Sequence, residues 1–337
     1  MAGVPFSFDS GLNDSIFGKS LAPIRSIIQK RYQAHEANSL VKVLFDVYDT
    51  DNWGDKFTSM TSMRGFVPGG ENASFPKDHI QESYSKTVEY IEWRDSFTIT
   101  RKAADDTKNM DAKKKPVQFM QSYNETREMY AAATFGAAIS GKTTHNFRGT
   151  NFDVTGADGC TLFSKEHPSV LDKKFKQCNM FADEFNEDTL YAAETAMQQF
   201  CGDNGDILAL SPDTIVIPND YRLKKAVIQV VGSDKTPDTS NNGWNLHYGR
   251  WNIIVNPYLN QFITKGTSPW MLMDSKANKE IGGAVWGERV PLEIDAYIDK
   301  GTKGLQFDGY ARFGAAFVDW RVFCVGGVSG GNSLLGE

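Results

Sequence analysis

The stretch PVQFMQSYNETREMYAAATFGAAISGK, residues 116–142, predicts one long helix around which the rest of the chain is organised. Pro116 suits a first helical position, where its missing N–H has no partner to lose. Apolar side chains then recur at helical spacing: Val117, Met120, Tyr123, Ala131, Phe135 and Ala138. Gly141 before Lys142 fits the end of a helix. At about 1.5 Å per residue the helix is roughly 40 Å long, enough to form the spine of an extended subunit.

The end of this stretch matches a nucleotide-binding pattern. Residues 136–143, GAAISGKT, fit the phosphate loop GxxxxGK[ST] letter for letter. That loop needs a buried strand before it and a helix after it, so that backbone N–H groups face the phosphates. Here a helical pattern precedes it, and residues 144–153, THNFRGTNFD, follow without helical periodicity. We therefore predict the end of a helix and no nucleotide site.

Composition excludes several classes of protein. The 337 residues have room for two domains or one elaborate domain. No apolar run approaches the length of a membrane span, and the N-terminal stretch lacks the pattern of a secretory signal. The net charge of −6 argues against a surface that binds nucleic acid throughout, although a local basic patch remains compatible with it.

No chemical motif stands out along the chain. The cysteines form no CxxC pair and have no histidine at zinc-finger spacing, which predicts free thiols and no metal site: Cys160, Cys178, Cys201 and Cys324. His167 has no partner at ligand spacing and is interpreted as structural. Residues 49–55, DTDNWGD, resemble a calcium loop, but Trp53 and Met60 occupy ligand positions, so a polar turn is expected.

Catalytic signatures are also missing. The five histidines are scattered, and neither GxSxG nor HExxH occurs. We expect no catalytic residue and no cofactor. A soluble α/β enzyme stays open as an alternative, because an active site assembles in space and not in sequence.

The first part of the chain does not look able to fold alone. Residues 1–20 carry isolated aromatic side chains (Phe6, Phe8 and Phe17) that suit an arm pinned onto another surface. Residues 21–35 predict an amphipathic helix, and residues 41–50 predict a strand.

Residues 56–100 predict a long hairpin. Its strands alternate on both sides of Arg94 and Asp95, and Pro-Gly-Gly at 68–70 forms a tip. A mostly polar hairpin is barely stable alone in water, so we expect it to lie on a neighbouring subunit. Aromatic candidates for this contact are Trp53, Phe66 and Trp93.

A lysine run stands at the start of the long helix: Lys113, Lys114 and Lys115. The helix dipole is positive at that end, so cations are unfavourable there. The run is either a solvated surface or a contact for an acidic partner or nucleic acid.

The second half predicts α/β structure that closes with strands. Asn186 is a candidate cap for a helix, and residues 220–231 predict another. Strands are expected at 215–217, 250–259, 269–274 and within 280–325, followed by a loose tail.

Four stretches carry a resemblance to a known family: DGCTLFSKEHPS (158–169), SPDTIVIPNDYRLKKAVIQVV (211–231), WNIIVNPYL (251–259) and FGAAFVDWRV (313–322). With the order of elements, they resemble the major capsid protein of tailed bacteriophages, which has the Hong Kong 97-type fold. The sequences of these stretches are most similar to those of Mu-like major head subunits.

The resemblance implies an α+β phage capsid fold with an N-terminal arm, an extended β-hairpin loop, a peripheral domain with a long spine helix, and an axial domain. The implied boundaries are 1–45 for the arm, 46–54, 105–155 and 286–326 for the peripheral domain, 55–104 for the extended loop, 156–285 for the axial domain and 327–337 for the tail.

The resemblance also implies a function. Copies of the chain would form pentamers and hexamers of an icosahedral shell that encloses double-stranded DNA without sequence-specific binding. The implied partners are a separate scaffold protein, a portal and decoration proteins, and the implied location is the virion after assembly in the host cytoplasm. A nanocompartment shell of the same fold, like an encapsulin, is the alternative within this class.

Overall fold

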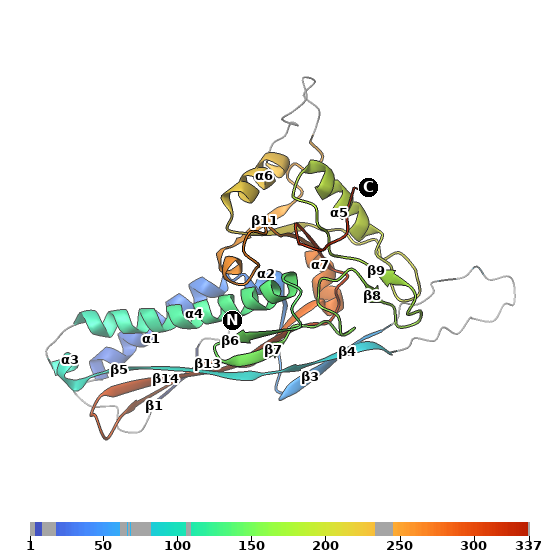
Figure 1. Ribbon diagram of the computed structural model, residues 1–337. Helices are drawn as coiled ribbons and strands as arrows, with labels where there is room; N and C mark the ends of the chain where they lie inside the picture. Colours follow the sequence, from blue (N-terminus) through green and yellow to red (C-terminus); the bar gives the residue numbers. More distant parts are fainter. Residues whose placement is uncertain are drawn as a thin grey trace.

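The computed structural model describes residues 4–8, 18–60, 66, 68, 82–105, 109–232 and 245–335. It has an elongated lower layer, in which two helices lie on a long sheet, and a smaller upper layer built on a second sheet (Figure 1). Helices and strands are mixed in both layers, which confirms the predicted α+β class.

The spine helix is α4, Asn109–Ile139. It begins well before Pro116, so the prediction that Pro116 occupies the first helical position is wrong. A proline inside a helix forfeits a hydrogen bond, at a cost of about 3 kcal/mol, but it does not forbid the helix from continuing. All residues from Tyr130 to Ile139 are buried, as expected of a helix that is apolar on every side.

The predicted end of the spine helix is confirmed. Gly141 has a φ of 68°, and its N–H donates to the Ala138 carbonyl at 3.0 Å. The N–H of Lys142 donates to the Ala137 carbonyl at 3.0 Å, which completes a Schellman motif. The residues that imitate a phosphate loop therefore lie in a buried helix and its cap.

The long sheet has the order β1 (Phe6–Phe8), β13 (Ala284–Ile298), β14 (Leu305–Phe317) and β5 (Ile91–Ile99), and β2 (Asp46–Asp49) also pairs with β13. Strand β5 runs straight through Arg94 and Asp95, which pair with Tyr310 and Gly309. The predicted hairpin strands on both sides of these two residues are therefore wrong. The reason is tertiary, because Trp93 stacks on Phe313 and holds β5 in the sheet.

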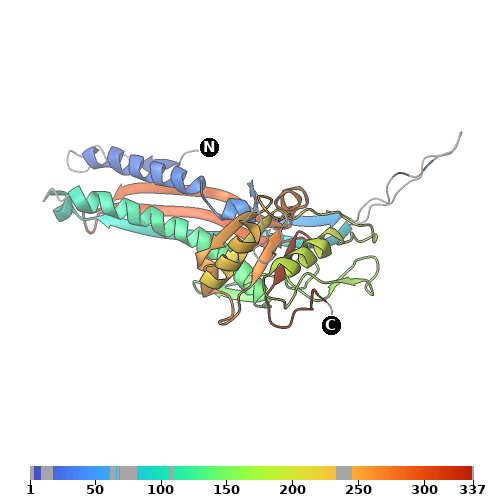
Figure 2. The same cartoon turned by 90° about the horizontal axis from the view of Figure 1, so that it is seen from above.

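Two helices cover one face of the long sheet. Helix α1 (Gly18–Glu36), predicted at 21–35, lies beside α4 (Figure 2). Short helices are α2 (Val41–Leu44) and α3 (Arg101–Asp105). The strand predicted at 41–50 is thus wrong in its first half, because Val41 and Leu44, one helical turn apart, are both buried.

The second sheet has the order β11 (Asn252–Asn256), β10 (Thr214–Pro218), β12 (Trp270–Met273) and β15 (Phe323–Gly326). Helices α5 (Glu187–Gln198) and α6 (Tyr221–Val231) cover its upper face (Figure 1). The predicted cap is confirmed, since the Asn186 side chain accepts the Thr189 N–H at 2.8 Å. Strand β15 falls within the range expected for the peripheral domain, yet it pairs with β12.

The remaining elements are short. They are the hairpins β3 (Gly54–Met60) with β4 (Glu82–Glu89), β6 (Thr144–Phe147) with β7 (Thr150–Asp153) and β8 (His167–Pro168) with β9 (Lys176–Gln177), and the turns η1 (Pro257–Gln261), α7 (Ser275–Ala277) and η2 (Asn278–Gly282).

The tail was expected to be loose, but its described part is hydrogen-bonded. The Ala182 N–H donates to the Asn332 carbonyl at 2.9 Å, and the Leu334 N–H donates to the Asp183 carboxylate at 2.6 Å. No helix within the described ranges is long and apolar enough to cross a membrane.

Candidate assembly surfaces

The strands β3 and β4 pair as a hairpin at the lower edge of the molecule (Figure 1). Its register runs from Gly54 opposite Glu89 to Met60 opposite Glu82. Along β4, only Val88 is buried. A mostly polar hairpin therefore exists where one was predicted, but its strands are β3 and β4, and Gly69 and Gly70 of the predicted tip lie outside the described residues.

Two of the predicted contact residues expose large rings on this part of the molecule. Trp53, just before β3, is 66% exposed, and Phe66 is fully exposed. Burial of apolar surface contributes a favourable free energy of about 25 cal/mol per Å², which these rings lack while they are exposed to water. Both side chains are therefore suited to burial against another chain.

The base of the hairpin is tied to the long sheet. The Tyr90 hydroxyl donates to the Asp55 carboxylate at 2.5 Å, and the Tyr48 hydroxyl lies 2.6 Å from that of Tyr90. Because the single hydroxyl hydrogen of Tyr90 is donated to Asp55, the Tyr48 hydroxyl is the donor to the Tyr90 oxygen. Burial raises the pKa of Tyr48 to about 12. Gly287 makes room for this pair, since a Cβ there would collide with the Tyr90 ring.

A second tie joins the hairpin to the β6–β7 hairpin. The Lys86 ammonium donates to the Asp153 carboxylate at 2.6 Å and to the Thr155 hydroxyl at 2.9 Å. Burial raises the pKa of Asp153, but the hydrogen bond and charge of Lys86 outweigh it and hold the pKa below its ordinary value. The Lys86 side chain is only 12% exposed, so its charge is committed to this contact.

A third tie reaches the upper layer. The Ser83 hydroxyl donates to the Asp203 carboxylate at 3.0 Å, and the Arg321 guanidinium donates to the same carboxylate at 2.9 Å. The three ties together fix the direction in which β3 and β4 leave the body.

The spine helix is anchored by a fully buried cation. Arg127 on α4 donates to Glu36 on α1 at 2.5 Å and forms an ion pair with Glu288 on β13. Lys42 forms a further ion pair with Glu36. Burial raises the pKa of Glu36, but the charges of Arg127 and Lys42 hold it below its ordinary value. One side chain thus joins both helices to the long sheet.

The three predicted lysines have different surroundings. Lys115 donates to the Thr98 carbonyl at 2.6 Å and is used within the chain. Lys114 is exposed. The side chain of Lys113 lies outside the part that the structure describes.

The aromatic candidates of the arm and of β5 contact their own chain. The Phe6 ring lies 5.4 Å from the Arg25 guanidinium, and β1 pairs with β13. The side chain of Phe8, like the whole of Phe17, lies outside the part that the structure describes. Trp93 is half-buried against Tyr130, so its role between chains stays a prediction, as do those of the other candidates.

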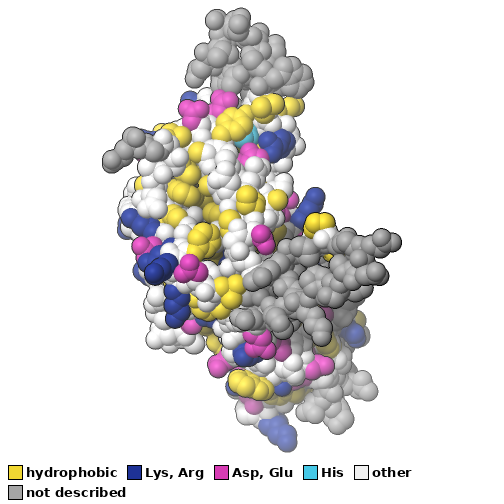
Figure 3. Space-filling model, turned by 90° about the vertical axis from the view of Figure 1, so that its right-hand side faces the viewer, with side chains coloured by type: hydrophobic (Ala, Val, Ile, Leu, Met, Phe, Trp, Pro, Cys, Tyr) yellow, Lys and Arg dark blue, Asp and Glu magenta, His cyan; other side chains and the backbone are white. Residues whose placement is uncertain are grey.

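Exposed apolar side chains also occur in the upper layer. Hydrophobic side chains are scattered over the face shown in Figure 3, which is the right-hand end of Figure 1. Among the residues of the expected axial domain, large apolar side chains are exposed at Leu171, Phe175, Ile207, Tyr221, Ile228, Leu246 and Tyr248.

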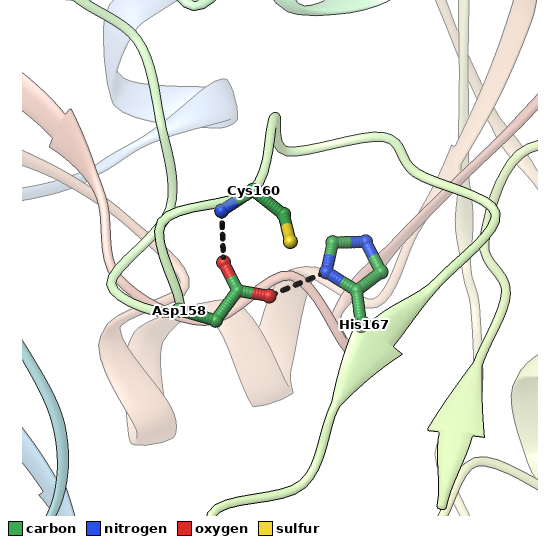
Figure 4. Close-up of side chains that lie close together, drawn as sticks. All are labelled: Asp158, Cys160 and His167. Carbon is green, nitrogen blue, oxygen red and sulfur yellow. Dashed lines mark hydrogen bonds and ion pairs between the residues drawn. The ribbon is translucent and has the colours of Figure 1, made fainter. Parts of the chain in front are cut away.

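One cluster of reactive side chains lies in the loop between β7 and β8. Asp158, Cys160 and His167 bring a carboxylate, a thiol and a ring nitrogen within 4.8 Å of one another (Figure 4). His167, interpreted as structural, therefore has two neighbours in space that its position in the sequence did not indicate. The missed signal is D-x-C-x6-H, which matches no common zinc spacing because a folded loop creates the contact.

A cavity of about 700 Å³ lies between α1, the turn before β3 and β13. Its charged lining is mostly acidic: Glu36, Asp49, Asp51 and Glu288, with Arg289. None of the described residues that line it is a serine, cysteine or histidine, so they supply no nucleophile paired with a histidine base.

Comparison with known proteins gives one family. A family model described as "Phage capsid protein" matches residues 91–325. Among curated proteins, no sequence matches the chain.

Solved structures with a similar fold include the capsid of Ralstonia phage GP4 (TM-score 0.49, 10% identity, 83% of this chain and 87% of that chain). The capsid of Cyanophage P-SCSP1u gives a TM-score of 0.49 at 10% identity over 88% of this chain and 89% of that chain. A virus-like particle from Pyrococcus furiosus gives 0.47 at 9% identity over 90% and 97%.

Proposed function

The chain belongs to the phage capsid protein family, and from this premise we propose that its copies assemble as pentamers and hexamers into an icosahedral shell around double-stranded DNA. Membership makes it a structural protein of the capsid. The finer proposal is supported by the mostly polar β3–β4 hairpin and by the exposed rings of Trp53, just before β3, and Phe66, after it. A compact enzyme would not need a hairpin of this kind, whereas a shell subunit can use it to contact a neighbouring chain.

The proposal includes partners and a place. A scaffold protein, a portal and decoration proteins assist assembly in the host cytoplasm, and the product is the virion. The net charge of −6 is compatible with a container for DNA. An acidic chain does not attract the phosphates overall, so it does not bind the packaged DNA tightly.

Negative-stain electron microscopy with light scattering on the purified chain tests this proposal. Closed shells, or rings of five and six, are expected. A homogeneous particle of one to four chains, unchanged by concentration or added scaffold, would refute the proposal and favour the alternative of a soluble enzyme.

A deletion in the segment between β3 and β4 tests whether the hairpin is needed for assembly. Removing residues 67–74 is expected to abolish assembly while leaving a folded chain, and R148A in the exposed β6–β7 turn is the matched control. Assembly that survives the deletion would refute the role of the hairpin. Nuclease protection of DNA in shells purified from producing cells separates a DNA container from one that encloses proteins.

A further inference from the structure

The Asp158–Cys160–His167 cluster is built by a tight loop. Gly159 has a φ of 79°, a conformation that favours glycine, and it turns the chain between Asp158 and Cys160. The Asp158 carboxylate accepts the Cys160 N–H at 3.0 Å through one oxygen, and its other oxygen lies 2.6 Å from Nδ1 of His167 (Figure 4). The side chains of Asp158 and His167 are almost completely buried.

Asn179 fixes which nitrogen of His167 carries a hydrogen. Its side-chain nitrogen donates to the Leu162 carbonyl at 2.8 Å and to the Phe323 carbonyl at 3.2 Å, and its Oδ1 accepts the Ser164 N–H at 2.9 Å. The oxygen is therefore the atom that faces Nε2 of His167, at 3.1 Å. Nε2 must be the donor in that contact.

This assignment leaves two acceptors facing each other. With its hydrogen on Nε2, the neutral ring presents a lone pair at Nδ1 to the carboxylate of Asp158. Two acceptors at 2.6 Å need a positive ion between them. In the metal-free chain a proton shared by Nδ1 and the carboxylate fills that position. Stacking of His167 on Trp320, with ring centroids 4.2 Å apart, holds the ring in this orientation.

The thiol of Cys160 is the third member. Burial and the nearby Asp158 charge raise the pKa of this thiol, so it stays protonated beside the carboxylate. Asp158 and a Cys160 thiolate would carry two negative charges, and a neutral His167 would carry none. That set balances one divalent cation. Nitrogen, sulfur and oxygen donors together suit zinc better than magnesium or calcium, which prefer oxygen.

We propose that Asp158, Cys160 and His167 form a binding site for one zinc-class divalent ion. The ion replaces two protons, one from the thiol of Cys160 and the one shared by Nδ1 of His167 and Asp158, and both leave to solvent. Asn179 acts as a positioning residue, because it orients the ring with Nδ1 toward the site. Cys160 is partly exposed, so the ion can enter from its side. The site does not depend on shell formation.

Titration of the purified, metal-free full chain with Co²⁺, followed by absorption spectroscopy, tests the proposal. One ion per chain is expected, with a thiolate-to-cobalt charge-transfer band that Zn²⁺ abolishes by displacement. C201S is the matched control, since Cys201 is another partly exposed free cysteine, and it is expected to behave as the parent.

C160S is expected to lose the charge-transfer band and to bind at least about tenfold more weakly. This variant keeps the volume of a partly exposed side chain, so it is expected to fold, and circular dichroism checks that. Absence of stoichiometric binding by the parent would overturn the proposal. An unchanged band in C160S would overturn it as well.

Discussion

Gly136 on the spine helix lies against Phe262 so closely that a Cβ on Gly136 would stand 2.5 Å from the Cβ of Phe262. Such a distance is far inside van der Waals contact. The glycine therefore lets α4 approach the segment that follows η1, and the Ser140 hydroxyl donates to the Phe262 carbonyl at 3.3 Å just beyond it. The first glycine of the apparent phosphate loop is thus a packing residue between the two layers of the subunit.

The variant G136A is expected to destabilise the chain by about 1–2 kcal/mol. Alanine gains up to about 1 kcal/mol over glycine inside a helix, but overpacking at a buried site costs about 1–3 kcal/mol. Urea unfolding measures the difference. Q118A, at an exposed position of the same helix, is the control and is expected to change stability by less than about 0.5 kcal/mol. A G136A chain as stable as the parent would show that the contact with Phe262 relaxes freely.

The variant R127M is expected to destabilise the chain by about 3–5 kcal/mol, because it leaves Glu36 and Glu288 without their buried cation. Chemical denaturation of the unassembled chain measures this. K114M removes a positive charge from an exposed position of α4 and is expected to be nearly neutral. Equal effects of the two substitutions would contradict the role of Arg127 as the buried cation that joins α1 and α4 to β13.

The same network predicts a dependence of stability on pH. The charges of Arg127 and Lys42 hold the folded-state pKa of Glu36 below its ordinary value of 4.5 despite its burial. A carboxyl with a depressed pKa stabilises the fold above the unfolded pKa, and this contribution is lost as pH falls through the folded pKa. The free energy of unfolding should therefore decrease below about pH 4.5. Urea titrations at several pH values should show a shallower decrease for E36Q than for the parent, and equal slopes would contradict the assignment.

Local sequence signals predicted those elements whose ends are fixed by neighbouring residues. Gly141 ends the spine helix, Asn186 caps α5, and Asp220 caps α6 by accepting the Arg222 N–H at 3.0 Å. In each case the residue that satisfies the free backbone group lies within a few positions, so the sequence contains the whole interaction.

Signals that depend on distant residues could not be read from the sequence. The polar pair Arg94 and Asp95 resembles a turn, yet β14 holds these residues in a strand. The contact of His167 with Asp158 requires the loop to fold back, and the Lys86 tie requires the β6–β7 hairpin to reach β4. Of the predicted contact residues, Trp53 and Phe66 are exposed, and their contact with another chain stays a prediction.

The variants W53S and F66S are expected to impair assembly without lowering the stability of the unassembled chain. Both rings are exposed, so their removal leaves no internal cavity. Analytical ultracentrifugation follows assembly, and thermal unfolding follows stability. L335S, which changes an exposed apolar side chain far from the hairpin in sequence, is the control. Normal shells from W53S and F66S would place the contact between chains elsewhere.

The variant K86M is expected to loosen the hairpin while leaving the rest of the chain unchanged. Lys86 is nearly buried, but the side chain of its partner Asp153 is 57% exposed, so water screens the ion pair. We therefore expect a loss of global stability below about 1 kcal/mol. The tie nonetheless joins β4 to β7, and its loss should raise hydrogen exchange at the backbone amides of β3 and β4. Mass spectrometry of the unassembled chain measures this, with K56M on the exposed face of β3 as the control. Exchange that rises equally in α4 would show that Lys86 supports the whole fold, and exchange that does not rise in β4 would show that the contacts of Tyr90 and Ser83 hold the hairpin alone.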